Sequence, residues 1–503
     1  MNIKRGLSRA VKLLIFLLIA VLLFSSITLI FLPKWRGTWK SSDTVSGFYA
    51  LEEDSIDTLI LGSSQVISGV SSMQLYQQQG IRAYSLGTER QPMMASYYLL
   101  KDALRTQPNL KAVVLEVTEL FQQCEESTYR KAFDYMPLSS VKWEAIQDHV
   151  KWEEKADEAA GTDTAPTAAS YLLPILAYHD RWYDLDEDDF TYFLQDRSDL
   201  RRGFSLQPGQ GARGTYLPLD TERTAVCAQP KEEALFFLQA VEQLCQDQNL
   251  SLTFLKTPRI EWSVEECNTV QALAKEYDVP YLDFNTTTLG DAIGYDYAVD
   301  NLKKSPTHLN LWGAQKLTAY LGSYLAASTP VIDARTNPKY AYMDAGLLLY
   351  QQEVNDSYLT QETDFKAYLS KLYRSRYSVL VAVNGAGTGA YPDDIKRSME
   401  QFGLDPRVTA GGCYVAAVEH GTVLADQWSR KPVTQSVTLA DGISCTLTSD
   451  DTPFTPVCSI TVDGTKRALS DPGLNIVVYN HETGKIVDSV AFDFTETEVI
   501  ATR

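Results

Sequence analysis

The sequence predicts an α/β protein with one membrane-spanning helix and two folded domains, and three patterns support this prediction. An apolar run without any charge covers residues 13–32. From about residue 57 to 327, short apolar runs alternate with helical stretches, which is typical of a parallel sheet covered by helices. After about residue 372, apolar runs alternate with turn dipeptides, which favours a smaller, mostly antiparallel domain.

The first 35 residues are expected to form a cytoplasmic stub and a transmembrane signal anchor. A 20-residue helix is ~30 Å long, which matches the apolar core of a bilayer. Four basic residues precede the run and only Lys34 follows it closely, so the positive-inside rule places residues 36–503 outside the cell. The alternative is a cleaved signal peptide, but the residues after the run offer no small-residue cleavage site.

Length and charge restrict the function. The 503 residues have room for two or three domains, and 45% hydrophobic with 22% charged residues exclude a disordered chain. The chain carries 64 acidic against 45 basic residues, a net charge of -19. A nucleic-acid partner is therefore not expected, because polyanions would be repelled.

The seven cysteines are too few for a disulfide-built scaffold. The chain contains no C-x-x-C motif, so no metal site is expected. Cys445 and Cys458 lie in two β-rich runs separated by a turn-like segment, so they are a candidate disulfide across a hairpin.

A candidate nucleophile follows the first predicted strand. That strand ends in Gly62-Ser63-Ser64, and catalytic groups of open α/β sheets lie at the carboxyl ends of strands. Ser64 is therefore a candidate nucleophile. The alternative is an ordinary glycine turn in which a serine caps the next helix.

A candidate base lies some 240 residues further on. His308 is one of only five histidines, and it stands in a predicted loop just before the last helix of the first domain. A loop-held imidazole can take a proton from a serine when it reaches hydrogen-bond distance. Taken alone, His308 is better explained as a histidine at the surface or at the start of a helix.

Together these motifs resemble the SGNH (GDSL-like) hydrolase superfamily, most closely its membrane-anchored branch with the DltD and alginate-acetylation proteins of bacteria. The resemblance covers roughly residues 50–328 and includes a G-x-S strand end, a glycine at Gly87 after the next strand, and a late H-L-N-x-x-G-A segment. It implies a flavodoxin-like three-layer domain over residues 36–328. In that domain Ser64 is the nucleophile and His308 the base, while the N–H groups of Gly87 and Ser64 form the oxyanion hole.

The sequence departs from that family at the orienting acid. The family usually has an acid three residues before its histidine, where this chain has Ser305. Asp300 or Asp296 is the candidate replacement, and a Ser-His dyad or a decayed site are the alternatives. The third-block asparagine of the family also has no evident counterpart, since that strand offers Glu116 instead.

Three further residues are candidates for substrate binding. Gln65 follows the nucleophile directly, and Lys256 ends a predicted strand, where it could bind an anionic or carbonyl group. Arg181 lies beside Trp182 in a segment that suggests a sugar-facing or lipid-facing insertion. An ordinary solvated lysine and local packing of the arginine are the alternatives.

Residues 329–371 are expected to connect the first domain to a second one over residues 372–503. The second domain contains a G-x-G-x-x-A motif at 385–390, but acidic residues follow where a pyrophosphate would bind, so no dinucleotide and no other cofactor is expected. The run GLNIVVYN at 473–480 and its surroundings resemble the interleukin-like EMT inducer (ILEI/PANDER-like) domain. That resemblance implies a β-sandwich-like module with a lectin-like role.

The sequence therefore predicts a single-pass protein of the bacterial cell envelope. Its expected activity is that of a serine esterase or O-acyltransferase on an acylated surface polysaccharide. The alternative is an inactive scaffold that binds a glycan or a membrane-bound O-acyltransferase, which the absence of the orienting acid favours.

Overall fold

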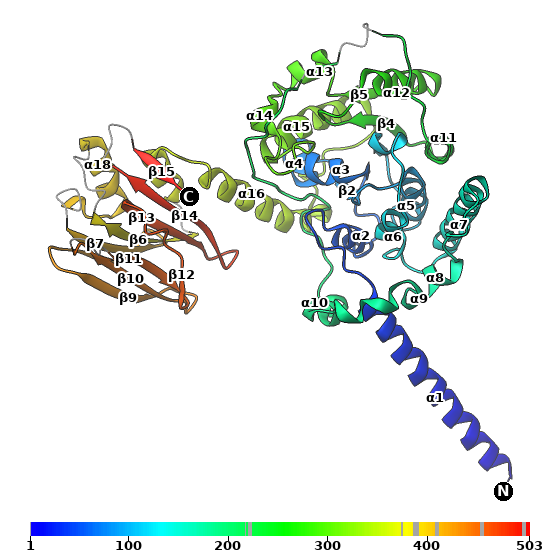
Figure 1. The fold of residues 1–503 in the computed structure, drawn as a ribbon, viewed down its shortest axis with the longest axis horizontal. Helices are drawn as coiled ribbons and strands as arrows, with labels where there is room; N and C mark the ends of the chain where they lie inside the picture. Colours follow the sequence, from blue (N-terminus) through cyan, green and yellow to red (C-terminus); the bar gives the residue numbers. More distant parts are fainter. Residues whose placement is uncertain are drawn as a thin grey trace. The chain divides into compact units, whose positions relative to one another are not determined.

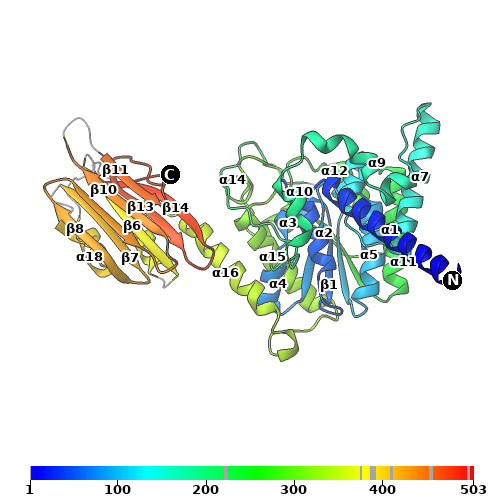
Figure 2. The same cartoon turned by 90° about the horizontal axis from the view of Figure 1, so that it is seen from below.

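The computed structural model describes residues 2–216, 218–219, 224–373, 376–385, 392–407, 412–452, 457–494 and 499–503. The chain divides into two compact units, Met1–Gln351 and Gln352–Arg503, which Figures 1 and 2 show as ribbons. The boundary falls within the segment expected to connect the two domains. Most of the G-x-G-x-x-A motif lies outside the described residues.

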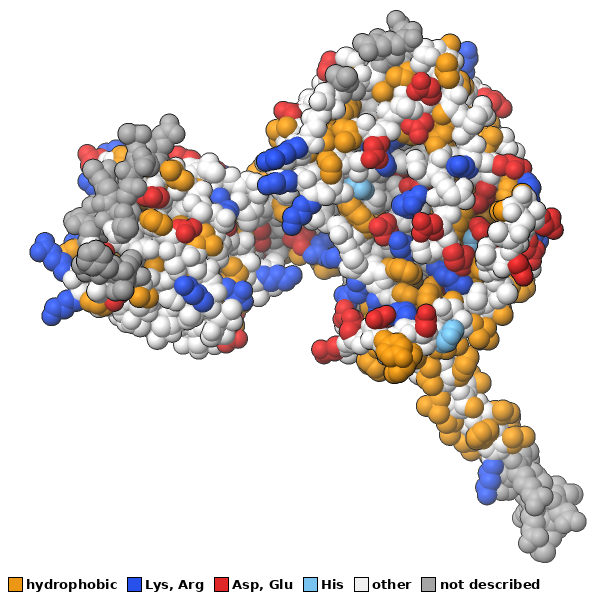
Figure 3. All heavy atoms as spheres, in the orientation of Figure 1, with side chains coloured by type: hydrophobic (Ala, Val, Ile, Leu, Met, Phe, Trp, Pro, Cys, Tyr) orange, Lys and Arg blue, Asp and Glu red, His pale blue; other side chains and the backbone are white. Residues whose placement is uncertain are grey.

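The N-terminal helix α1 (Asn2–Phe31) is long and apolar enough to cross a membrane over Val11–Phe31. Its apolar side chains from residue 11 onward are mostly exposed in the chain itself, and Figure 3 shows them as a continuous apolar surface. A helix that is apolar on all sides requires an apolar surrounding, as lipid provides.

The centre of the first unit is a five-stranded parallel sheet in the order β2-β1-β3-β4-β5. This order is that of flavodoxin-like doubly wound sheets, and it reverses direction between β1 and β3. The strands read as nearly continuous apolar runs because both faces of the sheet are covered. Their bounds are β1 (Thr58–Gly62), β2 (Ala83–Gly87), β3 (Ala112–Glu116), β4 (Ser251–Lys256) and β5 (Tyr281–Asp283).

Helices cover both faces of this sheet and bury alternate strand residues. One face packs Ile60 and Val114 against α3, α4 and α15. The other face packs Leu59 and Val113 against α2, α5, α11 and α12. These helices are α2 (Ser41–Tyr49), α3 (Ser64–Gly69), α4 (Ser72–Gln79), α5 (Met93–Thr106), α11 (Glu232–Asp247), α12 (Val264–Glu276) and α15 (Leu311–Ser328).

A helical insertion separates β3 from β4. It contains η1 (Thr118–Leu120), α6 (Glu126–Phe133), α7 (Ser140–Ala160), α8 (Ala168–Leu172), α9 (Ile175–Tyr178), η2 (His179–Tyr183), α10 (Glu187–Thr191) and η3 (Tyr192–Leu194). The helices α9, η2 and α10 contact α1, so the insertion surrounds the point where α1 ends (Figure 1). The remaining helices between β5 and the second sheet system are α13 (Thr287–Ala292), α14 (Tyr297–Asp300), η4 (Pro338–Tyr340), α16 (Met343–Leu359) and α17 (Phe365–Leu372).

The second unit is built from two antiparallel sheets. One has the order β15-β14-β13-β6-β7-β8 and the other β12-β11-β10-β9. Leu380 and Val415 from the first sheet pack against Leu447 and Ile460 from the second. The strands are β6 (Tyr377–Asn384), β7 (Cys413–Glu419), β8 (Thr422–Ser429), β9 (Val433–Thr438), β10 (Ser444–Asp450), β11 (Val457–Val462), β12 (Thr465–Lys466), β13 (Gly473–Asn480), β14 (Lys485–Asp493) and β15 (Ile500–Thr502).

Two helices, α17 and α18 (Asp393–Phe402), cover the outer face of the six-stranded sheet through Tyr368, Leu369 and Met399. The helix α18 is strongly amphipathic, since its buried residues are Ile395, Met399 and Phe402. The expectation of a mostly antiparallel second domain that contains one helix, α18, is therefore confirmed.

The predicted disulfide between Cys445 and Cys458 is wrong, because both thiols are free. The two cysteines do lie on adjacent strands, but Cys445 pairs with Val462 and Cys458 pairs with Ser449. Cys458 is thus displaced by four residues along β10, or ~13 Å at ~3.3 Å per residue. A disulfide requires Cα atoms within ~7 Å.

Candidate active site at the carboxyl edge of the parallel sheet

Ser64 lies where the strand order of the parallel sheet reverses. It is the first residue of α3, directly after the turn that ends β1, and its neighbour Ser63 caps the helix by accepting a hydrogen bond from the Gln65 N–H. In open α/β sheets the crevice at this reversal is the usual position of a site. The Ser64 side chain is largely covered, with 6% of the residue exposed.

Glycine is required at both strand ends beside Ser64. Gly62 has a φ of 152°, and a Cβ there would come within 2.6 Å of the Glu116 Cβ. Gly87 pairs with Gly62, and a Cβ there would come within 3.0 Å of the Ser63 carbonyl oxygen. The backbone of Gly87 therefore lies against the turn that carries Ser64.

His308 meets Ser64 across the sheet edge. The Ser64 Oγ lies 2.8 Å from the His308 Nε2, although 244 residues separate them in the chain. On the other side of the ring, Nδ1 lies 2.8 Å from the Ser305 Oγ and 3.1 Å from the Thr307 Oγ1. The ring with its proton on Nδ1 can donate to these hydroxyls while Nε2 accepts from Ser64.

The surroundings of His308 keep its ring neutral. Burial, and next the positive charges of Arg259 and Lys256, lower the pKa of His308 to about 3. A neutral imidazole can accept the Ser64 proton, but this environment also disfavours the imidazolium that forms when it does.

Asp300 does not orient His308. Its carboxylate is fully buried, forms an ion pair with the Lys316 Nζ at 2.7 Å and accepts a hydrogen bond from the Asp296 N–H. It therefore fixes the loop before His308. Asp296 caps α14 by accepting from the Ala298 N–H, so neither of the two expected carboxylates is the partner of Nδ1.

Gln65 holds loops together and is 1% exposed. Its Oε1 accepts from the Thr257 Oγ1 at 2.8 Å, and its Nε2 donates to the Thr307 carbonyl oxygen at 3.1 Å. The side chain thus joins the turn of Ser64 to the loops after β4 and before α15. Both polar ends are occupied, so the amide positions the loop of His308 instead of facing a substrate.

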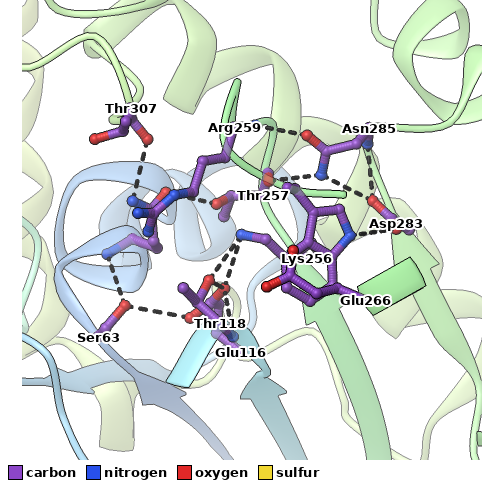
Figure 4. A network of polar contacts seen from close by, with 12 residues as sticks. Ser63, Glu116, Thr118, Lys256, Thr257, Arg259, Glu266, Asp283, Asn285 and Thr307 are labelled. Carbon is purple, nitrogen blue, oxygen red and sulfur yellow. Dashed lines mark hydrogen bonds and ion pairs between the residues drawn. The ribbon is translucent and has the colours of Figure 1, made fainter. Parts of the chain in front are cut away.

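Lys256 forms a buried ion pair beneath the site (Figure 4). Its Nζ lies 3.2 Å from the Glu116 Oε1 and donates to the Thr118 Oγ1 at 2.8 Å, and the residue has no exposed surface. The Ser63 Oγ donates to the Glu116 Oε2 at 3.3 Å. Lys256 therefore supports the turn that carries Ser64 and cannot contact a substrate without rearrangement.

Arg181 lies in the insertion at the end of α1. Its Nη1 donates to the Phe31 carbonyl oxygen at 2.6 Å, and Nη2 forms an ion pair with the buried Asp189 at 3.2 Å. Arg181 therefore caps the C-terminal end of α1, and the expectation that it binds substrate is not supported by these contacts.

Two residues that shape the site were not predicted from the sequence. Trp39 stacks on the His308 ring with centroids 4.3 Å apart, and it comes from the segment between α1 and α2. Asn310 accepts from the N–H groups at the start of α15 and donates to three backbone carbonyls, including that of Gly209. An asparagine just before a helix is a common N-cap, so the capping role of Asn310 could have been predicted from the sequence. Nothing in the sequence links Trp39 to His308.

A second cluster of polar side chains lies in the other unit. Among the described residues, the potential ligand atoms of Glu419, His420 and His481 lie within 4.8 Å of one another. However, the His481 Nε2 lies 2.7 Å from the Ser378 Oγ and its Nδ1 lies 2.9 Å from the Asp441 Oδ2. Both ring nitrogens already have partners, so the cluster is explained as a polar network, and we assign it no metal.

No protein-family model matches the sequence, and no curated protein is detectably similar to it. The functional interpretation therefore rests on the chemistry of the site.

Proposed function

We propose that the protein is a serine esterase or O-acyltransferase that acts on an acylated polysaccharide of the cell envelope. The observation that carries the proposal is the 2.8 Å contact between the Ser64 Oγ and the His308 Nε2 at the reversal point of the sheet. The parallel sheet order and the positions of Gly87 and His308 agree with the resemblance to SGNH hydrolases. The acylated glycan comes from that resemblance to the membrane-anchored branch.

The reaction follows from the contacts. The Ser64 oxygen bonds to the acyl carbon while its proton moves to the His308 Nε2, and the N–H groups of Gly87 and Ser64 stabilise the oxyanion. The ester bond to the sugar then breaks, and Nε2 returns the proton to the departing sugar oxygen. Water or a second sugar hydroxyl releases the acyl group by the same steps, which gives an esterase or a transferase.

Hydroxyl groups replace the usual carboxylate behind the ring. Ser305 and Thr307 can each accept a hydrogen bond from the Nδ1–H and hold the ring in the required tautomer, but they do not offset the charge of an imidazolium. We therefore propose a slow Ser-His dyad. The second unit, by its ILEI-like pattern, would hold the glycan.

A second candidate is an inactive scaffold for a glycan or for a membrane-bound O-acyltransferase. The observation that favours it is the environment of His308, where burial and two positive charges lower the pKa of the ring to about 3. A decayed site retains the Ser-His contact but does not stabilise the charge that develops during catalysis.

The test uses the full-length protein in detergent with a fluorophosphonate probe and with p-nitrophenyl acetate. The wild type is expected to be labelled and to hydrolyse the ester, whereas Ser64→Ala and His308→Ala should lose both signals. Ser378→Ala is the matched control, because Ser378 also contacts a histidine but is fully buried. A wild type that reacts with neither reagent would favour the scaffold.

A further inference from the structure

The helical insertion of the first unit exposes a cluster of large apolar side chains, which we call the apolar belt. In 23 residues of chain it presents eight exposed large hydrophobics, with Leu194 at 85% and Tyr183 at 75% exposure. So many exposed large apolar side chains in one short segment indicate an interaction site. The belt consists of Leu172, Leu173, Leu176, Trp182, Tyr183, Phe190, Phe193 and Leu194.

Ion pairs and hydrogen bonds fix the belt to the end of α1. Arg181, within the belt segment, donates to the last carbonyl of α1, that of Phe31. Lys34 forms a buried ion pair at 3.1 Å with Asp189, which is next to Phe190. Because α9, η2 and α10 all contact α1, the belt elements surround the exit of this helix (Figure 1), and Figure 3 shows exposed apolar side chains there.

The residue types of the belt suit the boundary between lipid and water. Trp182 and Tyr183 combine apolar rings with polar groups, as do the aromatic residues that anchor proteins at headgroup level. Leucine and phenylalanine favour the acyl region just below. We propose that the apolar belt inserts into the outer leaflet of the membrane that α1 spans, and thereby fixes the first unit on the bilayer surface.

The charges of the belt segment indicate what drives this insertion. Asp180, Asp184, Asp186 and Glu187 are exposed beside the apolar side chains, whereas Arg181 is engaged with α1. Anionic headgroups would be repelled, so burial of apolar area and not charge attraction must provide the affinity. The belt should therefore enter a bilayer of purely zwitterionic lipid.

Insertion of the belt also limits the position of the candidate active site, a consequence that rests on the proposed function. Trp39 contacts the His308 ring and lies five residues after Lys34, which is fixed at the end of α1. Five residues span at most ~18 Å. The substrate would then be a glycan or acyl carrier held close to the membrane.

The experiment measures the depth of the belt without using activity. Full-length protein with Cys227→Ser and Leu194→Cys is labelled with an environment-sensitive NBD dye and placed in phosphatidylcholine nanodiscs with or without doxyl lipid. Cys227 is removed because it is the exposed native cysteine among the described residues. The dye is expected to lose about half of its emission with doxyl lipid, because interfacial segments are buried ~5–10 Å.

The matched control carries the dye at Phe236→Cys. Phe236 is also apolar and exposed, at 51%, but lies on α11, well away from α1 in Figure 1. The Cys227→Ser parent gives the background from the other native cysteines, of which Cys124 is half-buried and the rest are buried. Equal emission at position 194 with and without doxyl lipid, or equal quenching at both positions, would overturn the proposal. A different result would be a dye at position 194 that is not quenched, together with two protein chains per nanodisc by mass photometry. It would show that the apolar belt contacts a second copy of the protein and not the lipid.

Discussion

Two serine-histidine pairs in this protein have nearly the same geometry and different surroundings. In the first unit Ser64 lies 2.8 Å from His308, and in the second unit Ser378 lies 2.7 Å from His481. The second pair even has the carboxylate that the first lacks, since Asp441 lies 2.9 Å from the His481 Nδ1. By distances alone, the second unit has the better catalytic triad.

Position in the fold and solvent access nevertheless make Ser64 the better candidate nucleophile. Ser378 lies within β6, has no exposed surface and also donates to the Glu419 Oε1 at 3.1 Å. Ser64 lies at a strand-to-helix turn at the edge of a parallel sheet, beside a glycine backbone. A nucleophile needs space for the acyl carbon and donors for the oxyanion, and a hydrogen bond to histidine supplies neither.

The comparison is most directly tested by removing each serine hydroxyl. Ser64→Ala is expected to lower p-nitrophenyl acetate hydrolysis by ~10³-fold or more, because the covalent step cannot occur. Ser378→Ala should retain the rate and lose ~1 kcal/mol of stability from its hydrogen bonds. Steady-state kinetics and chemical unfolding measure the two effects. Activity that disappears with Ser378→Ala and survives Ser64→Ala would invert the assignment.

The buried ion pair beneath Ser64 should contribute mainly to stability. Lys256→Met leaves the Glu116 carboxylate buried without its partner, so the free energy of unfolding should fall by ~3–5 kcal/mol. Lys366→Met, which removes an exposed ion pair with Asp394, should lower the free energy of unfolding far less, because solvent screens an exposed pair. Denaturant unfolding, followed by tryptophan fluorescence, measures the free energy of unfolding of both variants and of the wild type. Equal effects would mean that Lys256 is not a support of the turn.

A carboxylate placed behind His308 should make the Ser64–His308 pair resemble the Ser378–His481 pair. Ser305→Asp places a carboxylate where the Ser305 Oγ now lies 2.8 Å from the His308 Nδ1, so the pKa of His308 should rise and the esterase rate should increase ~10-fold. Ser305→Asn is the control of equal size without charge, and it should not exceed the wild type. An esterase rate that is the same in Ser305→Asp and in the wild type would show that the stability of the His308 imidazolium does not limit the reaction.

The pH profile tests the environment of His308 directly. The neutral ring is the active form, and a pKa of about 3 keeps it neutral at every pH above that value. Activity should therefore not fall near pH 6.5, where an unperturbed histidine would gain a proton, and should decline only towards pH 3. Glu119 is buried in η1, beside Thr118, and its carboxyl has a pKa raised to about 7 by burial and by the charge of Glu116. An inflection of the pH–activity profile near pH 7 that is absent in Glu119→Gln would be caused by the titration of Glu119.

The smallest expected effect is that of Trp39. Its ring stacks on His308, and such contacts are worth ~0.5–1.5 kcal/mol, so Trp39→Ala should lower the esterase rate ~2–10-fold. Trp143→Ala, which removes an exposed tryptophan of α7, should leave the rate unchanged. Equal rates for both variants would show that Trp39 only packs on the ring.

The local features of the protein could be predicted from the amino-acid sequence. The apolar run predicted α1, the alternation of strands and helices predicted the parallel sheet, and the turn-rich pattern predicted the antiparallel unit. Ser64 and His308 were also identified as candidates from sequence alone. These features depend on periodicity and on turn residues, which are properties of neighbouring positions.

Which distant side chains contact one another became clear only from the packed fold. The strand register separated Cys445 from Cys458, and the ion pair with Lys316 directed the Asp300 carboxylate away from His308. The contact of Trp39 with His308 joins positions 269 residues apart, and the apolar belt gathers residues that the sequence spreads over several short helices. Such contacts arise from the packing of distant elements, and no local pattern encodes them.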